Sequence, residues 1–267
     1  MAEKSNIAWT NATWNPVRGC ERVSEGCRKC YAEVLAGRHS YKGGWGEGVA
    51  KMVKRPDGKM EARWTGVLKP IEHKLDEPLR WQKPQRIFVN SMSDLFHKDV
   101  PFEFVGKVFN VMQLSGWHTF QVLTKRPARM LEFARLRRAA GYPILPNVWF
   151  GVSAEDQPTF DERTEILGRI PCAVRFVSAE PFLGDIDIGN AFDGRVEGSV
   201  YQPLDWAIIG GETGSGHRPM DIAAARAFIH QVKSMGGAMF VKQDSGPRPG
   251  LKGRFTDDEW ALKEYPQ

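Results

Sequence analysis

Six short apolar runs alternate with helical patterns along the chain, and this alternation limits the folds that it can adopt. The runs lie at residues 86–90, 119–123, 147–152, 174–177, 206–210 and 238–241. Each is rich in β-branched or aromatic residues and lacks polar alternation, which is typical of strands buried on both faces of a parallel sheet. Helical patterns follow Pro101, Pro127, Asp156 and Asp221. The sequence therefore predicts repeated βα units with right-handed crossovers, in an open doubly wound sheet or a barrel.

Polar stretches follow nearly every predicted strand directly. In chain order they read NSMSDLFH, TKRP, SAED, SAEP, GGETGSGHRP and KQDSG. In a βα barrel these positions converge on the carboxyl-terminal rim, where active sites are built. The pattern favours a barrel with one pocket over an open sheet.

Three of the four cysteines lie within eleven residues. Cys20, Cys27 and Cys30 have the spacing C-x6-C-x2-C, and they follow the strand-like segment ATWNPV. Three thiolates on one loop suit three irons of a [4Fe–4S] cluster and leave the fourth iron open. Zinc is an alternative, with His39 as a fourth ligand at an irregular spacing. Cys172 precedes a predicted strand and is expected to be a buried, small apolar residue.

The length and composition are those of one globular domain spanning residues 1–267. Apolar residues make up 42% of the chain, which is enough for a full core. The sequence contains no run of ~20 apolar residues and begins with a polar segment, so we expect no membrane span, no secretory signal and a cytoplasmic location. The clustered, odd set of thiols does not suit a disulfide framework. A net charge of +5 fits a polyanionic partner such as a nucleotide or nucleic acid.

Two segments stand outside the βα rhythm. Residues 40–66 are rich in glycine, lysine and arginine and contain Trp45 and Trp64. Such a loop suits phosphate contacts and base stacking with a nucleic-acid strand, but a stretch of this kind is more often a solvated insertion or a mobile lid. Residues 184–204 form a smaller excursion, in which a hairpin is predicted around Asp193-Gly194.

The cysteine loop and the rim segments together carry a family resemblance. TWNPVRGCERVSEGCRKCYAE, GVSAEDQ, SAEPFLG, IIGGETG and LKEYP resemble an uncharacterised phage-associated family predicted to belong to the radical S-adenosylmethionine superfamily. The resemblance covers most of the chain and implies a partial (β/α)6 barrel of TIM-like form. Two features differ from the common superfamily pattern: the first cysteine gap is six residues rather than three, and NSMSDLF replaces the glycine-glycine-glutamate run after the second strand.

The resemblance also implies a chemistry. A [4Fe–4S] cluster held by the three cysteines would bind S-adenosylmethionine and yield a 5′-deoxyadenosyl radical that abstracts hydrogen from a substrate, with electrons from a donor such as a flavodoxin or ferredoxin. For the methionyl amino group we expect Ser91, Ser93 and Asp94, and for its carboxylate Lys125 or Arg126. The remaining cofactor contacts are expected from Tyr31, Ser153, Glu155 and Glu180.

Substrate contacts are expected from the glycine-rich loop after the fifth run and from the last strand. The loop holds Glu212, His217 and Arg218, and Lys242 follows the last strand. Each rim residue also has a plain structural explanation: Ser93 and Asp94 suit a turn or helix cap, Glu155 a helix dipole, and the glycines a tight turn. Two further functions remain open: a zinc-containing, noncatalytic nucleic-acid-binding protein and an iron–sulfur redox or sensing protein.

Overall fold

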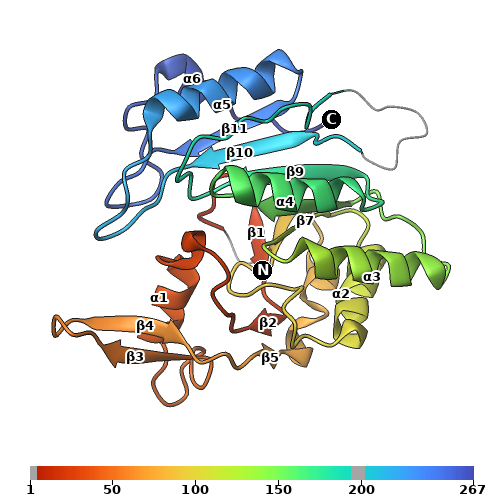
Figure 1. The fold of residues 1–267 in the computed structure, drawn as a ribbon. Coiled ribbons are helices and arrows are strands. Elements are labelled where there is room, and N and C mark those ends of the chain that lie inside the picture. The colour runs from red at the N-terminus through yellow and green to blue at the C-terminus, as the bar shows by residue number, and fades with distance from the viewer. Residues whose placement is uncertain (1–4, 194–201) are drawn as a thin grey trace. The chain divides into compact units, whose positions relative to one another are not determined.

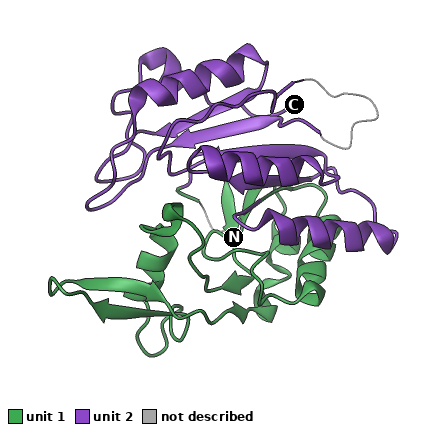
Figure 2. Cartoon of the chain, viewed as in Figure 1, with its two compact units in different colours: residues 1–6, 10–122 green, residues 7–9, 123–267 purple. Residues whose placement is uncertain are grey.

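The computed structural model describes residues 5–193 and 202–267. The described chain divides into two compact units (Figure 2): residues 1–6 and 10–122 belong to the first, residues 7–9 and 123–267 to the second. Each unit is described by itself below.

The first unit is built on parallel strands in the order β1-β6-β7. Their bounds are Ala12–Trp14 (β1), Arg86–Val89 (β6) and Thr119–Thr124 (β7), and β7 continues through the boundary between the units. Ala12 pairs with Ile87, and Arg86 pairs with Thr119. Trp14 and Phe120 are fully buried, with ring centroids 5.9 Å apart. Aromatic burial therefore fixes the short strand β1 in place.

Two small antiparallel pairs and two α-helices complete the first unit. Strand β2 (Val17–Arg18) pairs with β5 (Lys69–Pro70), and β3 (Ala50–Lys54) forms a hairpin with β4 (Met60–Trp64). The helices are α1 (Tyr31–Arg38) and α2 (Phe102–Leu114), with 3-10 turns η1 (Glu25–Cys27), η2 (Glu72–Lys74) and η3 (Glu77–Arg80). The β3–β4 hairpin packs one side on α1 and extends its tip away from this unit (Figure 1).

The second unit contains four parallel strands in chain order, β8-β9-β10-β11. Their bounds are Val148–Ser153, Val174–Ala179, Trp206–Gly210 and Ala238–Gln243. The helices are α3 (Pro127–Ala139), α4 (Gln157–Gly168), α5 (Ile222–Ser234) and α6 (Asp257–Ala261). Trp206 is fully buried on β10 and packs against the rings of Trp9, Phe176 and Tyr265.

Side-chain caps fix where two of these helices begin. Asp156 accepts a hydrogen bond from the Thr159 backbone N–H, and Thr159 completes a capping box before α4. Asp221 accepts hydrogen bonds from the backbone N–H groups of Ala223 and Ala224 at the start of α5. Such caps satisfy the free donors of the first helical turn.

The α/β class and every predicted strand are confirmed. The 40–66 insertion, expected as a loop, contains the β3–β4 hairpin. The prediction for Cys172 is wrong, because this residue is only half-buried; its thiol lies 3.4 Å from the Val174 carbonyl oxygen, at the open start of β9. The hairpin predicted around Asp193-Gly194 lies outside the described residues. Within residues 5–193 and 202–267, no helix is long and apolar enough to cross a membrane.

Candidate functional site

The cysteine loop begins after β2 and reaches α1 through a short, tightly constrained path. Gly19 has a φ of +92° and forms a parallel bridge with Ser93. A β-carbon at this position would lie 2.2 Å from the Val67 carbonyl oxygen, so only glycine fits. Cys27 ends η1, and Cys30 is the N-cap residue of α1. The three cysteines therefore lie in one loop that follows β1 and β2 and whose first residue, Gly19, bridges to the segment after β6.

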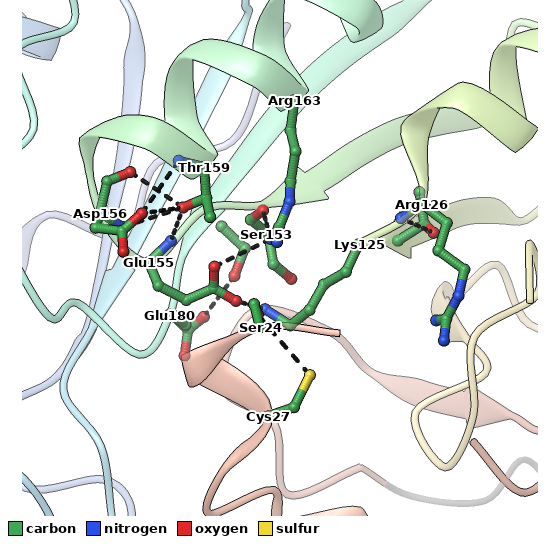
Figure 3. Close-up of polar contacts among 12 residues, drawn as sticks. Ser24, Cys27, Lys125, Arg126, Ser153, Glu155, Asp156, Thr159, Arg163 and Glu180 are labelled. Atoms are coloured by element: carbon green, nitrogen blue, oxygen red, sulfur yellow. Dashed lines mark hydrogen bonds and ion pairs between the residues drawn. The ribbon is translucent and has the colours of Figure 1, made fainter. Parts of the chain in front are cut away.

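All four cysteines are free thiols, and each is half-buried. Burial raises the pKa of the Cys30 thiol, and the neighbouring Cys27 adds to this effect. The Ser24 hydroxyl lies 3.9 Å from the Cys27 sulfur (Figure 3). Among the described residues, no three Cys, His, Asp or Glu side chains converge closely enough to hold a metal ion. The donor chemistry of the loop suits a three-thiolate site, and the sulfurs would have to draw together to form one.

Charged side chains on both flanks anchor this loop. Arg22 donates to Glu33, which is 2% exposed on α1, with 2.9 Å between Nε and Oε2. The other carboxylate oxygen of Glu33 accepts a hydrogen bond from the Trp64 backbone N–H at 2.9 Å. Glu21 lies 3.0 Å from the Lys98 ammonium. These contacts join the cysteine loop to α1, to β4 and to the segment after β6.

The segment after β6 meets the cysteine loop directly. The Tyr31 hydroxyl donates to the Ser91 carbonyl oxygen at 2.7 Å, and the Ser93 hydroxyl donates to the Val17 carbonyl oxygen at 2.9 Å. Ser91 donates to the Asn15 side-chain oxygen at 3.2 Å. Asp94 caps the following turn, since it accepts from the Phe96 backbone N–H at 2.9 Å. The structure thus brings the predicted residues Tyr31, Ser91 and Ser93 beside the loop that carries the thiols.

Asn90 is a notable residue of this region that the sequence did not single out. It is 2% exposed and has a φ of +61°, the only positive φ of a non-glycine residue in the described chain. Within that part of the chain, neither atom of its carboxamide has a hydrogen-bond partner. A buried, unsatisfied amide costs about 1–3 kcal/mol. Its place in NSMSDLF, directly after a buried strand, was the available signal.

In the second unit, the predicted residues Lys125 and Glu155 form a buried ion pair (Figure 3). Glu155 is 1% exposed, and its second oxygen accepts a hydrogen bond from Arg163 at 3.0 Å. Arg163 also donates to the Ser153 carbonyl oxygen at 2.8 Å. Glu155 is therefore part of a network that joins the ends of β7 and β8 to α4.

Arg126 does not join this network. Its backbone N–H donates to the Thr124 hydroxyl at 2.9 Å, at the N-cap of α3. Its side chain points away from Glu155 (Figure 3). The two alternatives given for one role, Lys125 and Arg126, therefore lie in different surroundings.

Glu180 and Lys242 meet across strand β10. Their carboxylate oxygen and ammonium nitrogen are 2.5 Å apart, and Glu180 also accepts from the Ser178 hydroxyl at 3.2 Å. Gly210, on the intervening strand, leaves room for this pair, because a β-carbon there would lie 2.9 Å from Glu180 Oε2. The pair links the ends of β9 and β11.

The loop after β10 holds Glu212 and Arg218 together. Glu212 is 5% exposed and accepts from the Arg218 backbone N–H at 2.8 Å and from its guanidinium at 2.5 Å. A ring nitrogen of His217 lies 3.1 Å from the Gly214 carbonyl oxygen, within the same loop. The predicted glycine-rich loop is thus folded around an internal ion pair.

Asp244 and Arg254 form a further pair that the sequence did not indicate. Asp244 is 2% exposed and accepts from the Arg254 guanidinium at 2.7 and 2.9 Å. Burial by itself would raise the pKa of Asp244, but hydrogen bonds from Arg254 and from the Ser245 backbone N–H outweigh it and lower the pKa to about 2. Nine residues lie between the partners, so no local motif pointed to this pair.

The arrangement defines an α/β protein with a three-cysteine loop after its first parallel strand and paired polar residues at the carboxyl ends of later strands. A family model described as "Protein of unknown function (DUF5131)" matches residues 4–254, and the chain belongs to this family. No curated protein and no solved structure matches the chain significantly.

Proposed function

We propose that this protein is a radical S-adenosylmethionine enzyme in a partial (β/α)6 barrel, with Cys20, Cys27 and Cys30 as the ligands of a [4Fe–4S] cluster. The observation that carries the proposal is the loop itself. It holds three thiols that are not in disulfides, it follows the parallel strand β1 and the short antiparallel strand β2, and the Tyr31–Ser91 hydrogen bond joins its end to the segment after β6. Carboxyl ends of parallel strands are where ligand sites form in such folds.

The chemistry that the proposal requires comes from the bound groups. Cys20, Cys27 and Cys30 would hold the cluster, and the cluster, once reduced by an external electron donor, would supply the one-electron chemistry that cleaves S-adenosylmethionine. The chain's own contribution is to bind, orient and exclude water.

The first unit offers groups for the methionyl end of S-adenosylmethionine. Ser91, Ser93 and Asp94 follow β6 beside the cysteine loop, and Asn90 adds a buried carboxamide with both a donor and an acceptor unused in the described chain. A ligand with an amino group and a carboxylate satisfies both kinds of atom. This match supports a role for Asn90 in ligand binding.

The second unit offers charge pairs for the nucleoside end and for the substrate. Glu155 and Glu180 each hold a lysine ammonium, and Glu212 holds Arg218. A ligand phosphate can pair with the cation of such a pair, and a ligand hydroxyl can donate to the carboxylate while the ion pair stays in place. We therefore assign Ser153, Glu155 and Glu180 to the cofactor and Glu212, His217, Arg218 and Lys242 to the substrate, as a nucleotide or nucleic-acid base.

The surroundings of His39 weigh against the zinc alternative. His39 is the C-cap residue of α1, whereas Cys30 is its N-cap residue, and eight residues of helix separate them. Nine helical rises, about 13–14 Å along the helix axis, therefore lie between the two residues. The His39 ring stacks on Trp45 with 5.6 Å between centroids, and its Nδ1 lies 2.9 Å from the Leu35 carbonyl oxygen. A metal ligand needs its nitrogen about 2 Å from zinc.

The proposal includes a reducing, cytoplasmic location and an electron donor such as a flavodoxin or ferredoxin.

The direct test is anaerobic reconstitution with iron and sulfide, followed by measurement of iron content and of 5′-deoxyadenosine formed from S-adenosylmethionine under dithionite. We expect about four irons per chain and cysteine-dependent product. Cys27→Ala is expected to abolish the product. Cys172→Ala is the matched control, because it removes the one cysteine outside the loop.

A colourless protein with one zinc and no product would refute the proposal. An iron–sulfur protein that fails to bind S-adenosylmethionine would instead support the redox or sensing function.

A further inference from the structure

The β3–β4 hairpin presents a basic face on the side opposite to α1. Cross-strand partners share a face of an antiparallel pair, and successive residues alternate between faces. Gly37 of α1 lies against Ala62, which pairs with Met52, so these residues mark the helix side. The opposite side carries Val53 and Glu61, together with four cations. These cations are Lys51, Arg55, Lys59 and Arg63.

The hairpin contains more positive charge than it can neutralise. Residues 50–64 hold five cations and two carboxylates, so they carry +3 of the chain's net +5. Asp57 pairs with Arg55 at 3.3 Å, and Glu61 pairs with Arg63 at 2.9 Å. The surplus is three exposed lysines that form no ion pair with the described residues. They are Lys51, Lys54 and Lys59.

The register places like charges opposite each other. Lys51 pairs directly with Arg63, and cross-strand like charges destabilise a hairpin. Of these two cations, Arg63 pairs with a carboxylate, that of Glu61, whereas Lys51 forms no ion pair with the described residues. A polyanion bound along this face would remove the repulsion.

The size of the face distinguishes between classes of polyanion. Lys51 and Arg55 are four residues apart on one strand, about 13 Å, and the two strands lie about 5 Å apart. A specific protein interface needs about 800 Å² on each partner, much more than this ribbon supplies. The major groove of a nucleic-acid duplex, by contrast, admits a two-stranded ribbon, and phosphates lie along its rims at close spacing.

The aromatic residues distinguish between duplex and single strand. Single-strand binding uses aromatic faces on which bases stack. Trp64 pairs with Ala50 and belongs to the helix side of the hairpin, and the Trp45 ring is stacked on His39. The basic face itself holds no aromatic residue. Phosphate contact without stacking is the mode of duplex binding.

We propose that the outer face of the β3–β4 hairpin docks on the phosphate backbone of a double-stranded nucleic acid through Lys51, Arg55, Lys59 and Arg63. This inference names the substrate of the proposed function as a duplex. It rests on the proposed function for the chemistry that follows docking. Binding itself requires no cluster.

The test measures binding of the full-length chain to a fluorescent 20-base-pair DNA duplex and to its RNA counterpart by anisotropy, across a salt series. Wild type is compared with Lys51→Gln/Lys59→Gln. Each lost phosphate contact lowers the slope of log affinity against log salt by about 0.9, so the double variant is expected to lose about 2 from the slope and about tenfold in affinity at 0.1 M salt.

The matched control is Lys83→Gln/Arg135→Gln, which removes two exposed cations elsewhere and is expected to leave slope and affinity unchanged. The circular dichroism spectra of both double variants are compared with that of the wild type to check that the variants fold. Lys54→Gln, on the helix side of the same hairpin, is expected to have the smaller effect.

Equal affinities of wild type and the hairpin double variant would overturn the inference. So would equal binding of poly-glutamate, which would indicate an acidic protein partner, or preferential binding of a single strand. The duplex titration is repeated with Cys27→Ala, which is expected to bind the duplex as the wild type does because binding requires no cluster. If the wild type binds the duplex but forms no 5′-deoxyadenosine, the radical chemistry is refuted and the docking inference stands.

Discussion

The strand ends of the second unit and the cysteine region of the first both pair buried carboxylates, as Glu33 does with Arg22, but the cysteine region also buries the Asn90 amide without a partner among the described residues. In the second unit Glu155, Glu180, Glu212 and Asp244 each hold a cation. In the first unit the Asn90 carboxamide is buried without a partner in the described chain, and the three loop thiols do not converge.

This difference separates preorganised groups from groups that await a ligand. Paired buried charges are held in place before any ligand arrives, which costs little reorganisation later. An unsatisfied buried amide lowers the free energy of unfolding, and such destabilising groups are commonly found at functional sites. The first unit is therefore where ligand binding is expected to change stability most.

The largest expected effect comes from unpairing the best-buried carboxylate. Glu155→Gln removes the carboxylate charge that pairs with Lys125 and with Arg163, which is 5% exposed. Breaking a buried ion pair in this way costs about 3–5 kcal/mol. Urea unfolding of the purified variant measures the loss.

Glu165→Gln is its matched control, because Glu165 pairs with Arg169 on the same helix but both are exposed. That change is expected to cost no more than about 1 kcal/mol. If both variants lost equally little, the second unit would not be held by its buried pairs.

A smaller effect is expected from the pH dependence of Asp244. Its pKa is lowered from 3.8 to about 2, so its stabilising contribution is fully present above about pH 4 and is lost as the pH falls through 2. That contribution is about 2 kcal/mol. The difference in unfolding free energy between wild type and Asp244→Asn should therefore shrink by this amount between pH 5 and pH 2.

Asp185→Asn, at an exposed carboxylate, gives the reference for this measurement. A wild-type advantage over Asp244→Asn that persisted unchanged at pH 2 would contradict the assigned hydrogen bonding to Arg254.

The same contrast explains what the sequence predicted and what it did not. Strands such as β10 were predictable because burial on both faces requires a continuous apolar run, and the start of α5 was predictable because Asp221 is a local cap. The pairing of Asp244 with Arg254 and of Glu180 with Lys242 depends on loop paths and strand order, which no local pattern encodes. Asn90 was missed because its lack of partners is a property of the folded surroundings.

Asn90→Gly sharpens the comparison from the other side. Glycine adopts the φ of +61° without strain and removes the unsatisfied amide, which together outweigh the entropy cost of glycine. We expect unfolding free energy to rise by about 1 kcal/mol, while affinity of the reconstituted protein for S-adenosylmethionine falls about tenfold. Urea unfolding and equilibrium dialysis measure the two quantities.

Asn190→Gly, in an exposed turn, is expected to change stability by no more than about 0.5 kcal/mol and to leave binding intact. A loss of stability in Asn90→Gly would show that the carboxamide has partners in solution and that the first unit is as well satisfied as the second.

The smallest effect on stability is expected at the β3–β4 hairpin. There the unpaired groups are lysine ammonium groups rather than an amide. Lys51→Gln removes the like-charge opposition to Arg63, which is expected to stabilise the hairpin by a few tenths of a kcal/mol, at the low end of the range of about 0.2–1 kcal/mol for such pairs. Hydrogen exchange of the hairpin's backbone amides reports local opening and so measures this gain more directly than global unfolding does. Lys83→Gln, outside the hairpin, should leave those amides unchanged. Slower exchange in Lys51→Gln together with weaker duplex binding would mean that Lys51 destabilises the hairpin but contributes to binding. Faster exchange would mean that Lys51 stabilises the hairpin and that its charge has a structural role.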